Sequence, residues 1–108
     1  MINVDRSNVE DKLSRSERTA VLFYADWCPY CRAFKPKFEA YAKKTKTELA
    51  EANISDEGDP LWDKFRVEVI PTVVVFSRGK QVARADGKAG IGLGEADLER
   101  VLKESDKR

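Results

Sequence analysis

Two short, uninterrupted apolar runs constrain the fold of this chain more than any other feature. Residues 20–25 and 72–76 consist of apolar and β-forming side chains, and neither run contains a charge. Runs of this length are typical of strands buried on both faces, which occur where helices cover both sides of a sheet. Because 108 residues suffice for one hydrophobic core but not for two, we predict a single α/β domain over residues 1–108.

The segments around these runs carry helix and strand patterns of their own. After the first run, apolar side chains recur at helical spacing up to Ala42, and Pro36 inside this pattern is expected to kink the helix. Residues 47–54 also have helix-forming composition, so local sequence alone would extend that helix through them. The other expected elements are an edge strand at 2–4, a helix at 7–15 begun by a capping box of Ser7 and Glu10, a short helix capped by Asp59, a hairpin of 72–76 with 81–85, and a closing helix at 95–102.

Composition and charge exclude several classes of function. The chain has 20 basic and 19 acidic residues, so its charge does not favour nucleic acid, an anionic membrane or an acidic substrate. It has no apolar signal core at its start and no run of the roughly 20 apolar residues that span a bilayer, so we expect a cytoplasmic protein. The glycine-rich residues 86–94 lack the strand and lysine context of a phosphate-binding loop, and we expect a flexible surface loop there.

The chain has only two cysteines, Cys28 and Cys31, and they closely follow the first apolar run. In a reducing compartment a single cysteine pair is more often catalytic or metal-binding than a structural disulfide. If a helix begins at this point, its N-terminus stabilises a thiolate at Cys28, which then acts as the nucleophile. Cys31, one turn inside the helix, would resolve the mixed disulfide. This redox dithiol is the favoured interpretation.

Two other interpretations of the pair stay open. A zinc site needs four ligands, and this chain offers two cysteines and no histidine. A metal or an iron–sulfur cluster would therefore have to be shared by two copies of the chain. In the third interpretation the cysteines are inert, which the intervening Pro29, the flanking Trp27 and the strand-to-helix context disfavour.

Beyond the cysteine motif, the chain resembles the thioredoxin superfamily over nearly its whole length, and small single-domain thioredoxins most closely. The motifs that carry the resemblance are Trp27-Cys28-Pro29-Tyr30-Cys31 after an apolar strand, Pro36 in the next helix, Ile70-Pro71-Thr72 before the second apolar strand, Gly79 in a hairpin turn, and Gly90 before the last helix. The resemblance implies a thioredoxin fold with a central mixed sheet of four or five strands and helices on both faces. It also implies that residues 48–54 form a strand and that the Pro71 peptide bond is cis.

The same resemblance implies a function and the residues that carry it. It implies thiol–disulfide exchange on protein substrates by Cys28 and Cys31, with Trp27 as a flat apolar docking surface. The backbone of Ile70, next to Pro71, would pair with an extended substrate segment as an added strand. No bound cofactor is expected; the redox-active disulfide would receive electrons from an NADPH-dependent flavoprotein reductase or from glutathione. A monomer is expected.

Leu22 departs from the thioredoxin pattern. Members of the family usually carry a buried acid at this position, six residues before the nucleophile, which helps to deprotonate the resolving thiol. Asp26 is nearby but should point outward at the end of the strand. Water or another carboxylate would therefore have to take over this role.

The residues between the cysteines, Pro29 and Tyr30, are a second departure. Thioredoxins usually have Gly-Pro here, whereas Pro-Tyr is typical of glutaredoxins, so a glutathione-dependent, glutaredoxin-like reductase is the alternative enzyme. The scaffold favours a thioredoxin, because residues 85–90 lack the Gly-Gly-x-Asp type of segment with which glutaredoxins hold glutathione.

Pro29 and Tyr30 should also shift the reduction potential of the Cys28–Cys31 pair, because they influence how well the helix stabilises the thiolate. By analogy with glutaredoxins, we expect a couple more oxidising than that of ordinary thioredoxin, by a shift on the order of tens of millivolts. Redox equilibration with glutathione buffers measures the potential. A value at or below that of ordinary thioredoxin would contradict this prediction.

Overall fold

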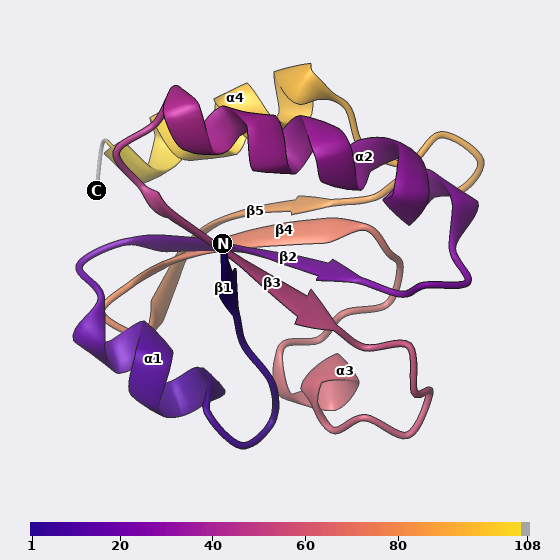
Figure 1. Ribbon diagram of the computed structural model, residues 1–108, viewed down its shortest axis with the longest axis horizontal. Helices are drawn as coiled ribbons and strands as arrows, with labels where there is room; N and C mark the ends of the chain where they lie inside the picture. The colour runs from indigo at the N-terminus through magenta and orange to yellow at the C-terminus, as the bar shows by residue number, and fades with distance from the viewer. Residues whose placement is uncertain (107–108) are drawn as a thin grey trace.

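Five strands form one mixed sheet in the computed structural model, which describes residues 1–106 (Figure 1). The strands are β1 (Ile2–Asn3), β2 (Thr19–Tyr24), β3 (Glu48–Asn53), β4 (Thr72–Ser77) and β5 (Lys80–Asp86). They lie in the order β1-β3-β2-β4-β5, with β1, β3 and β2 parallel to one another and β4 antiparallel to both β2 and β5. Both apolar runs therefore form inner strands, β2 and β4, as predicted.

Helices cover both faces of the sheet, which confirms the predicted α/β architecture (Figure 1). They are α1 (Val9–Arg15), α2 (Pro29–Ala40), α3 (Leu61–Lys64) and α4 (Glu95–Asp106), with a short 3-10 turn, η1 (Tyr41–Lys43), after α2. In Figure 1, α2 and α4 lie along one face, and α1 and α3 lie on the opposite face. Pro36 lies inside α2 without ending it. Within residues 1–106, no helix has the length and apolar character needed to cross a lipid bilayer.

Each face of the sheet carries its own apolar core, because successive side chains of a strand point to opposite faces. On the side of α2 and α4, Leu22 of β2 is buried with Phe34 and Phe38 of α2. On the side of α1, Phe23 of β2 is buried with Leu13. Because side chains of β2 are packed in both cores, the end of this strand is held in place where the cysteine motif begins.

β3 is a strand although its local sequence favours a helix. It pairs with β1 on one edge and with β2 on the other, and the small side chains of Ala50 and Ala52 are fully buried. Pairing on both edges outweighs the helix preference of the segment. The strand that the resemblance implied at residues 48–54 is confirmed, with the bounds Glu48–Asn53.

The capping box predicted for the first helix is wrong. Helix α1 begins at Val9, and its N-cap, Asn8, makes no side-chain capping hydrogen bond. The carboxylate of Asp5 instead accepts hydrogen bonds from the backbone N–H groups of Ser7 and Asn8, at 2.8 and 3.1 Å. A turn ahead of the helix, centred on an aspartate, therefore replaces the expected pair of Ser7 and Glu10.

Asp59, the cap predicted for the short helix, satisfies an N–H group at the start of α3, although the helix begins at Leu61 with Pro60 in the N-cap position. The carboxylate of Asp59 accepts a hydrogen bond from the backbone N–H of Leu61 at 2.9 Å, across Pro60. We expect Asp59→Ala to lower the free energy of unfolding by about 1 kcal/mol, because it leaves a helix N–H without its acceptor. Denaturant unfolding measures the effect, with the exposed Asp63 of the same helix changed to alanine as the control. Equal losses in the two variants would contradict the assignment of Asp59 as the cap.

Candidate active site

Cys28 caps the N-terminus of α2. After β2 ends, the backbone N–H of Cys28 donates to the carbonyl of Ala25 at 3.3 Å, which turns the chain toward the helix. The Sγ of Cys28 then accepts a hydrogen bond from the backbone N–H of Cys31 at 3.2 Å. Pro29 opens the helix at a position where its missing N–H costs no hydrogen bond. The structure thus places Cys28 at a helix N-terminus, where the sequence pattern predicted it.

The two thiols differ in their surroundings. Cys28 is 5% exposed, and its thiol donates to the carbonyl of Ile70 at 3.7 Å, whereas Cys31 is 1% exposed inside the first turn of α2. Burial, together with the adjacent Cys28 sulfur, raises the pKa of Cys31 to about 12. One sulfur at the mouth of the helix and one protonated sulfur behind it are what an attacking thiol and a resolving thiol require.

The segment around Pro71 forms the wall opposite the thiols. The Ile70–Pro71 peptide bond is cis, as the resemblance implied. Gly87, which follows β5, lies directly against this segment, because a Cβ built at Gly87 would stand 2.5 Å from the carbonyl oxygen of Pro71. Gly92 lies in the same way against Tyr30, with 3.0 Å between the built Cβ and the Cβ of the tyrosine. Two glycines therefore let the loop after β5 touch both walls of the site.

The loop after β5, which the sequence predicted as a flexible surface loop, is partly buried and carries backbone hydrogen bonds of its own. Gly87 and Gly92 are buried, and Lys88 and Gly92 exchange backbone hydrogen bonds of 2.8 and 3.1 Å. A Cβ at Gly90, the glycine that the sequence singled out, would meet nothing within 4 Å, so Gly90 does not build the wall. Hairpin register counted from the turn would place Asp86 opposite Pro71, and only the register shift between Val75 and Phe76 brings Gly87 there instead.

Exposed apolar side chains occur in the segments that form the site. Trp27 is 53% exposed and Tyr30 is 43% exposed, and the indole N–H of Trp27 donates to the carbonyl of Ser55 at 2.9 Å. Val69 and Ile91 are exposed as well; the first precedes the cis peptide, and the second lies in the loop that touches Tyr30. Large exposed apolar groups mark an interaction surface. Sequence reasoning found only Trp27 and Tyr30, because no motif contains the other two.

The sheet beneath α2 carries a carboxylate that sequence reasoning missed. Leu22 is fully buried, and Asp26 is exposed, with its carboxylate accepting a hydrogen bond from the Asn53 amide at 3.2 Å. Asp26 therefore points outward, as expected. Glu51 of β3 stands opposite Leu22 in the sheet, and side chains at paired positions share a face. Only the register of β3 reveals that Glu51 lies under α2, so no local signal could have found it.

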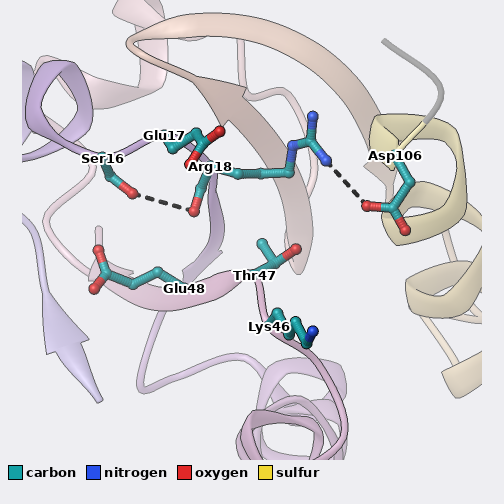
Figure 2. Close-up of a pocket in the computed structure, with 7 residues that line it drawn as sticks. All are labelled: Ser16, Glu17, Arg18, Lys46, Thr47, Glu48 and Asp106. Atoms are coloured by element: carbon teal, nitrogen blue, oxygen red, sulfur yellow. Dashed lines mark hydrogen bonds and ion pairs between the residues drawn. The ribbon is translucent and has the colours of Figure 1, made fainter.

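A separate hollow lies at the other end of the strands (Figure 2). It has a volume of about 320 Å³, and its lining residues are Ser16, Glu17, Arg18, Lys46, Thr47, Glu48 and Asp106. Most of these residues flank the starts of β2 and β3, whereas Cys28 follows the end of β2. In Figure 2, Arg18 extends toward Asp106 and donates to its carboxylate at 3.0 Å. The hollow is therefore distant from the thiols, and its mixed charges favour no particular ion.

Potential metal ligands do not gather at one point in the part of the chain that the structure describes. Within residues 1–106, no three side chains of cysteine, histidine, aspartate or glutamate form a group that could hold a metal ion. Metal binding by the two thiols would need ligands from a second copy.

Comparison with known proteins agrees with this geometry. The family model described as Thioredoxin matches residues 1–103. Among curated relatives, a thioredoxin of Echinococcus granulosus is 28% identical over 92 residues, which cover 85% of this chain and 86% of the relative. Protein disulfide-isomerase 1 of Caenorhabditis elegans is 32% identical over 87 residues, which cover 77% of this chain. The chain spans only 18% of the length of that isomerase.

Solved structures show the same fold. Thioredoxin f2 of Chlamydomonas reinhardtii superposes with a TM-score of 0.84, covering 100% of this chain and 98% of that chain at 18% sequence identity. A structural match at an identity this low is evidence for the fold alone. The family model, in contrast, matches the sequence itself over all but its last five residues, from 1 to 103 of 108. This protein therefore belongs to the thioredoxin family, whose chemistry is thiol–disulfide exchange.

Proposed function

We propose that the chain reduces disulfides in protein substrates, with Cys28 as the nucleophile and Cys31 as the resolving thiol. The Cys28 thiolate attacks one sulfur of a substrate disulfide, and the other substrate sulfur leaves as a thiolate that takes up a proton. Cys31 then loses its proton and attacks the Cys28 sulfur. The disulfide between the two cysteines forms, the bond to the substrate breaks, and the electron pair leaves with the substrate sulfur.

The observation that carries this proposal is the hydrogen bond of 3.2 Å from the backbone N–H of Cys31 to the sulfur of Cys28. A sulfur at this position faces the N–H groups and the partial positive charge of the helix N-terminus, which suits the negative sulfur of an attacking nucleophile. The deeper burial of Cys31 and its raised pKa support its assignment as the thiol that reacts second.

A substrate segment would dock across the surface formed by Trp27, Tyr30 and the backbone of Ile70. The carbonyl of Ile70 lies 3.7 Å from the Cys28 sulfur, so an extended chain paired with this backbone would hold its own sulfur within reach. The exposed rings of Trp27 and Tyr30 supply apolar area beside it. Pro29 and Pro71 contribute by fixing the backbone on the two sides of the sulfur.

The electron donor, the location and the assembly state are part of the proposal. An NADPH-dependent flavoprotein reductase would reduce the oxidised pair, in keeping with the family, and glutathione is the alternative that the Pro29-Tyr30 sequence raises. We expect a monomer in the cytoplasm that binds no cofactor.

Insulin reduction tests the activity and the donor together. The protein is supplied in turn with NADPH and a thioredoxin reductase, with NADPH, glutathione and glutathione reductase, and with dithiothreitol. Precipitation of reduced insulin with the thioredoxin reductase, at a much lower rate with glutathione, is the expected result. A faster reaction with glutathione would favour the glutaredoxin-like alternative. Failure to accelerate insulin reduction with all three donors would contradict the proposed function.

A further inference from the structure

Arg84 of β5 makes hydrogen bonds that the steps described above do not use. Its side chain is only 19% exposed. One terminal nitrogen of the guanidinium group donates to the carbonyl of Phe65 at 2.6 Å, and the other donates to the carbonyl of Arg66 at 2.7 Å. The Nε donates to the Asp86 carboxylate at 2.8 Å. Because the donors of a guanidinium group lie in one rigid plane, these bonds together fix the position of the two carbonyl groups.

The two carbonyl groups belong to the turn that ends α3. In this turn the backbone N–H of Arg66 donates to the carbonyl of Asp63 at 3.2 Å, and that of Val67 donates to the carbonyl of Trp62 at 2.8 Å. This pair of bonds is a Schellman motif, in which the residue after the helix adopts a left-handed backbone. Arg66 has a φ of +52°, which glycine adopts readily and arginine does not. The turn is therefore unfavourable for its own sequence and gains support from Arg84.

The turn leads directly into the backbone on which we expect a substrate to dock. Residues 67–70 connect Arg66 with the cis peptide bond at Pro71. Within residues 1–106, the backbone N–H groups of the last three residues of this segment donate no hydrogen bond. At its far end, the hydroxyl of Thr72 donates to the carbonyl of Val69 at 2.7 Å. The segment is therefore held mainly at its two ends, and Arg84 holds the turn at the first of them.

A second observation places the Arg84 side chain beside this segment. Arg84 pairs with Val74 of β4, and Val74 belongs to the core on the side of α1 and α3, so both side chains point to that face of the sheet. A shallow hollow on the same face is lined by Arg66, Glu68, Val69, Arg84 and Asp86. The arginine and the exposed part of the docking segment therefore lie on one surface.

We propose that Arg84 positions residues 67–70 for the docking of a protein substrate, because it holds the turn at Phe65 and Arg66 from which this segment starts. Arg84 acts through the backbone and not on the sulfur atoms, so it is a positioning residue. The inference rests on the proposed function, since it concerns the backbone beside Cys28 on which a substrate docks. Arg84 should therefore matter for a protein disulfide and not for a small one, which reaches Cys28 without docking.

Two disulfides of different size separate docking from reactivity in the reduced, full-length chain. Insulin is the protein substrate, and 4,4′-dithiodipyridine is a small, uncharged disulfide. Acid quenching, alkylation and mass spectrometry follow the formation of the Cys28–Cys31 disulfide with insulin in a single turnover. Absorbance of the released pyridinethione gives the initial rate with the small disulfide. Both second-order rates depend on the reactivity of Cys28, so in a fully folded variant their ratio, insulin over small disulfide, reports docking.

Arg84→Met keeps an unbranched apolar side chain and removes all three hydrogen bonds. We expect the ratio to fall roughly tenfold, with the rate for the small disulfide within about twofold of the wild-type value. Arg84→Lys keeps the charge without the planar set of donors, so its ratio should stay about threefold or more below that of the wild-type chain. Arg100→Met is the matched control, because Arg100 forms an exposed ion pair with Glu104 on α4. Its ratio should not change.

Asp86→Asn tests whether the ion pair alone is responsible. It removes the charge beside the guanidinium group and leaves both carbonyl bonds, so we expect a ratio within about twofold of the wild-type value. A wild-type ratio in Arg84→Met would overturn the positioning role. Full recovery in Arg84→Lys, or an equal loss in Asp86→Asn, would overturn it as well. Arg84→Lys alone decides the outcome if Arg84→Met does not fold. Failure of the wild-type chain to form its disulfide with insulin would instead remove the proposed function.

Discussion

Cys28→Ser is expected to abolish insulin reduction with every donor. A serine hydroxyl is not ionised near neutral pH, and a place at the helix N-terminus does not make it a nucleophile comparable to a cysteine. Cys31 cannot take its place, because it is 1% exposed and protonated. We expect a loss of about a thousandfold or more, down to the rate without protein. Turnover in Cys28→Ser at a measurable fraction of the wild-type rate would contradict the mechanism.

Cys31→Ser is the matched control, since it removes the second thiol and leaves the first in place. Its Cys28 should still attack a substrate disulfide, but the mixed disulfide should persist because no thiol resolves it. A covalent adduct with insulin should therefore accumulate, visible by mass spectrometry without reductant and released by dithiothreitol. An adduct that forms in Cys28→Ser and not in Cys31→Ser would reverse the two roles.

The central strands and the hairpin could be predicted from sequence because their signals are local. A strand buried on both faces needs apolar side chains at every position, and residues 20–25 show this directly. The turn between β4 and β5 could also be predicted, because Gly79 readily adopts a positive φ. In the structure Arg78 and Gly79 have φ values of +50° and +88°, the left-handed pair that a tight hairpin turn requires. The start of α2 belongs to the same class, because Pro29 at the first helical position is a local cue.

β3 shows where local sequence is insufficient. Its residues prefer a helix, and two neighbouring strands decide the outcome. Once the segment is a strand, the pairing of Glu51 with Leu22 determines which side chain lies under α2, and a shift of one residue would turn Glu51 to the other face. The position of this buried carboxylate therefore became visible only with the register. The family resemblance located the strand but drew attention to Leu22, the position where an acid is missing.

Gly87 was missed for a related reason. Four glycines lie between residues 87 and 94, and the sequence does not indicate which of them contacts the site. The answer depends on the path of β5, which brings Gly87 against Pro71 and leaves Gly90 in open space. Gly87 also differs from Gly90 and Gly92 in its backbone, because only the latter two have a positive φ, of +76° and +78°. The requirement for glycine at position 87 is therefore steric and not conformational.

Gly87→Ala is accordingly expected to impair both stability and activity. The added Cβ would lie 2.5 Å from the carbonyl oxygen of Pro71 and 3.4 Å from its nitrogen. Both are backbone atoms that cannot rotate away, so the end of β5 or the Ile70–Pro71 segment must move. Overpacking of this kind should lower the free energy of unfolding by about 2 kcal/mol. A shift of Ile70 would also change the 3.7 Å approach of its carbonyl to the Cys28 sulfur, and with it the backbone on which we expect a substrate to dock.

Gly58→Ala is the matched control, because it makes the same chemical change where space allows it. A Cβ at Gly58 would meet only a side-chain oxygen of Asp56, at 3.4 Å, and this flexible group can give way. We expect Gly58→Ala to keep wild-type stability and activity. Under conditions in which Gly87→Ala is fully folded, we expect it to reduce insulin roughly tenfold more slowly than the wild-type chain. A displacement of about 1 Å at a docking site can lower the rate by more than this. The rate at which Cys28 reacts with Ellman's reagent, a small disulfide, decides how the loss arises. Such a reagent does not need the docking backbone, so Gly87→Ala should keep this rate near that of the wild-type chain if only docking is damaged. If Gly87→Ala matches Gly58→Ala in unfolding and in insulin reduction, the contact with Pro71 does not position the site.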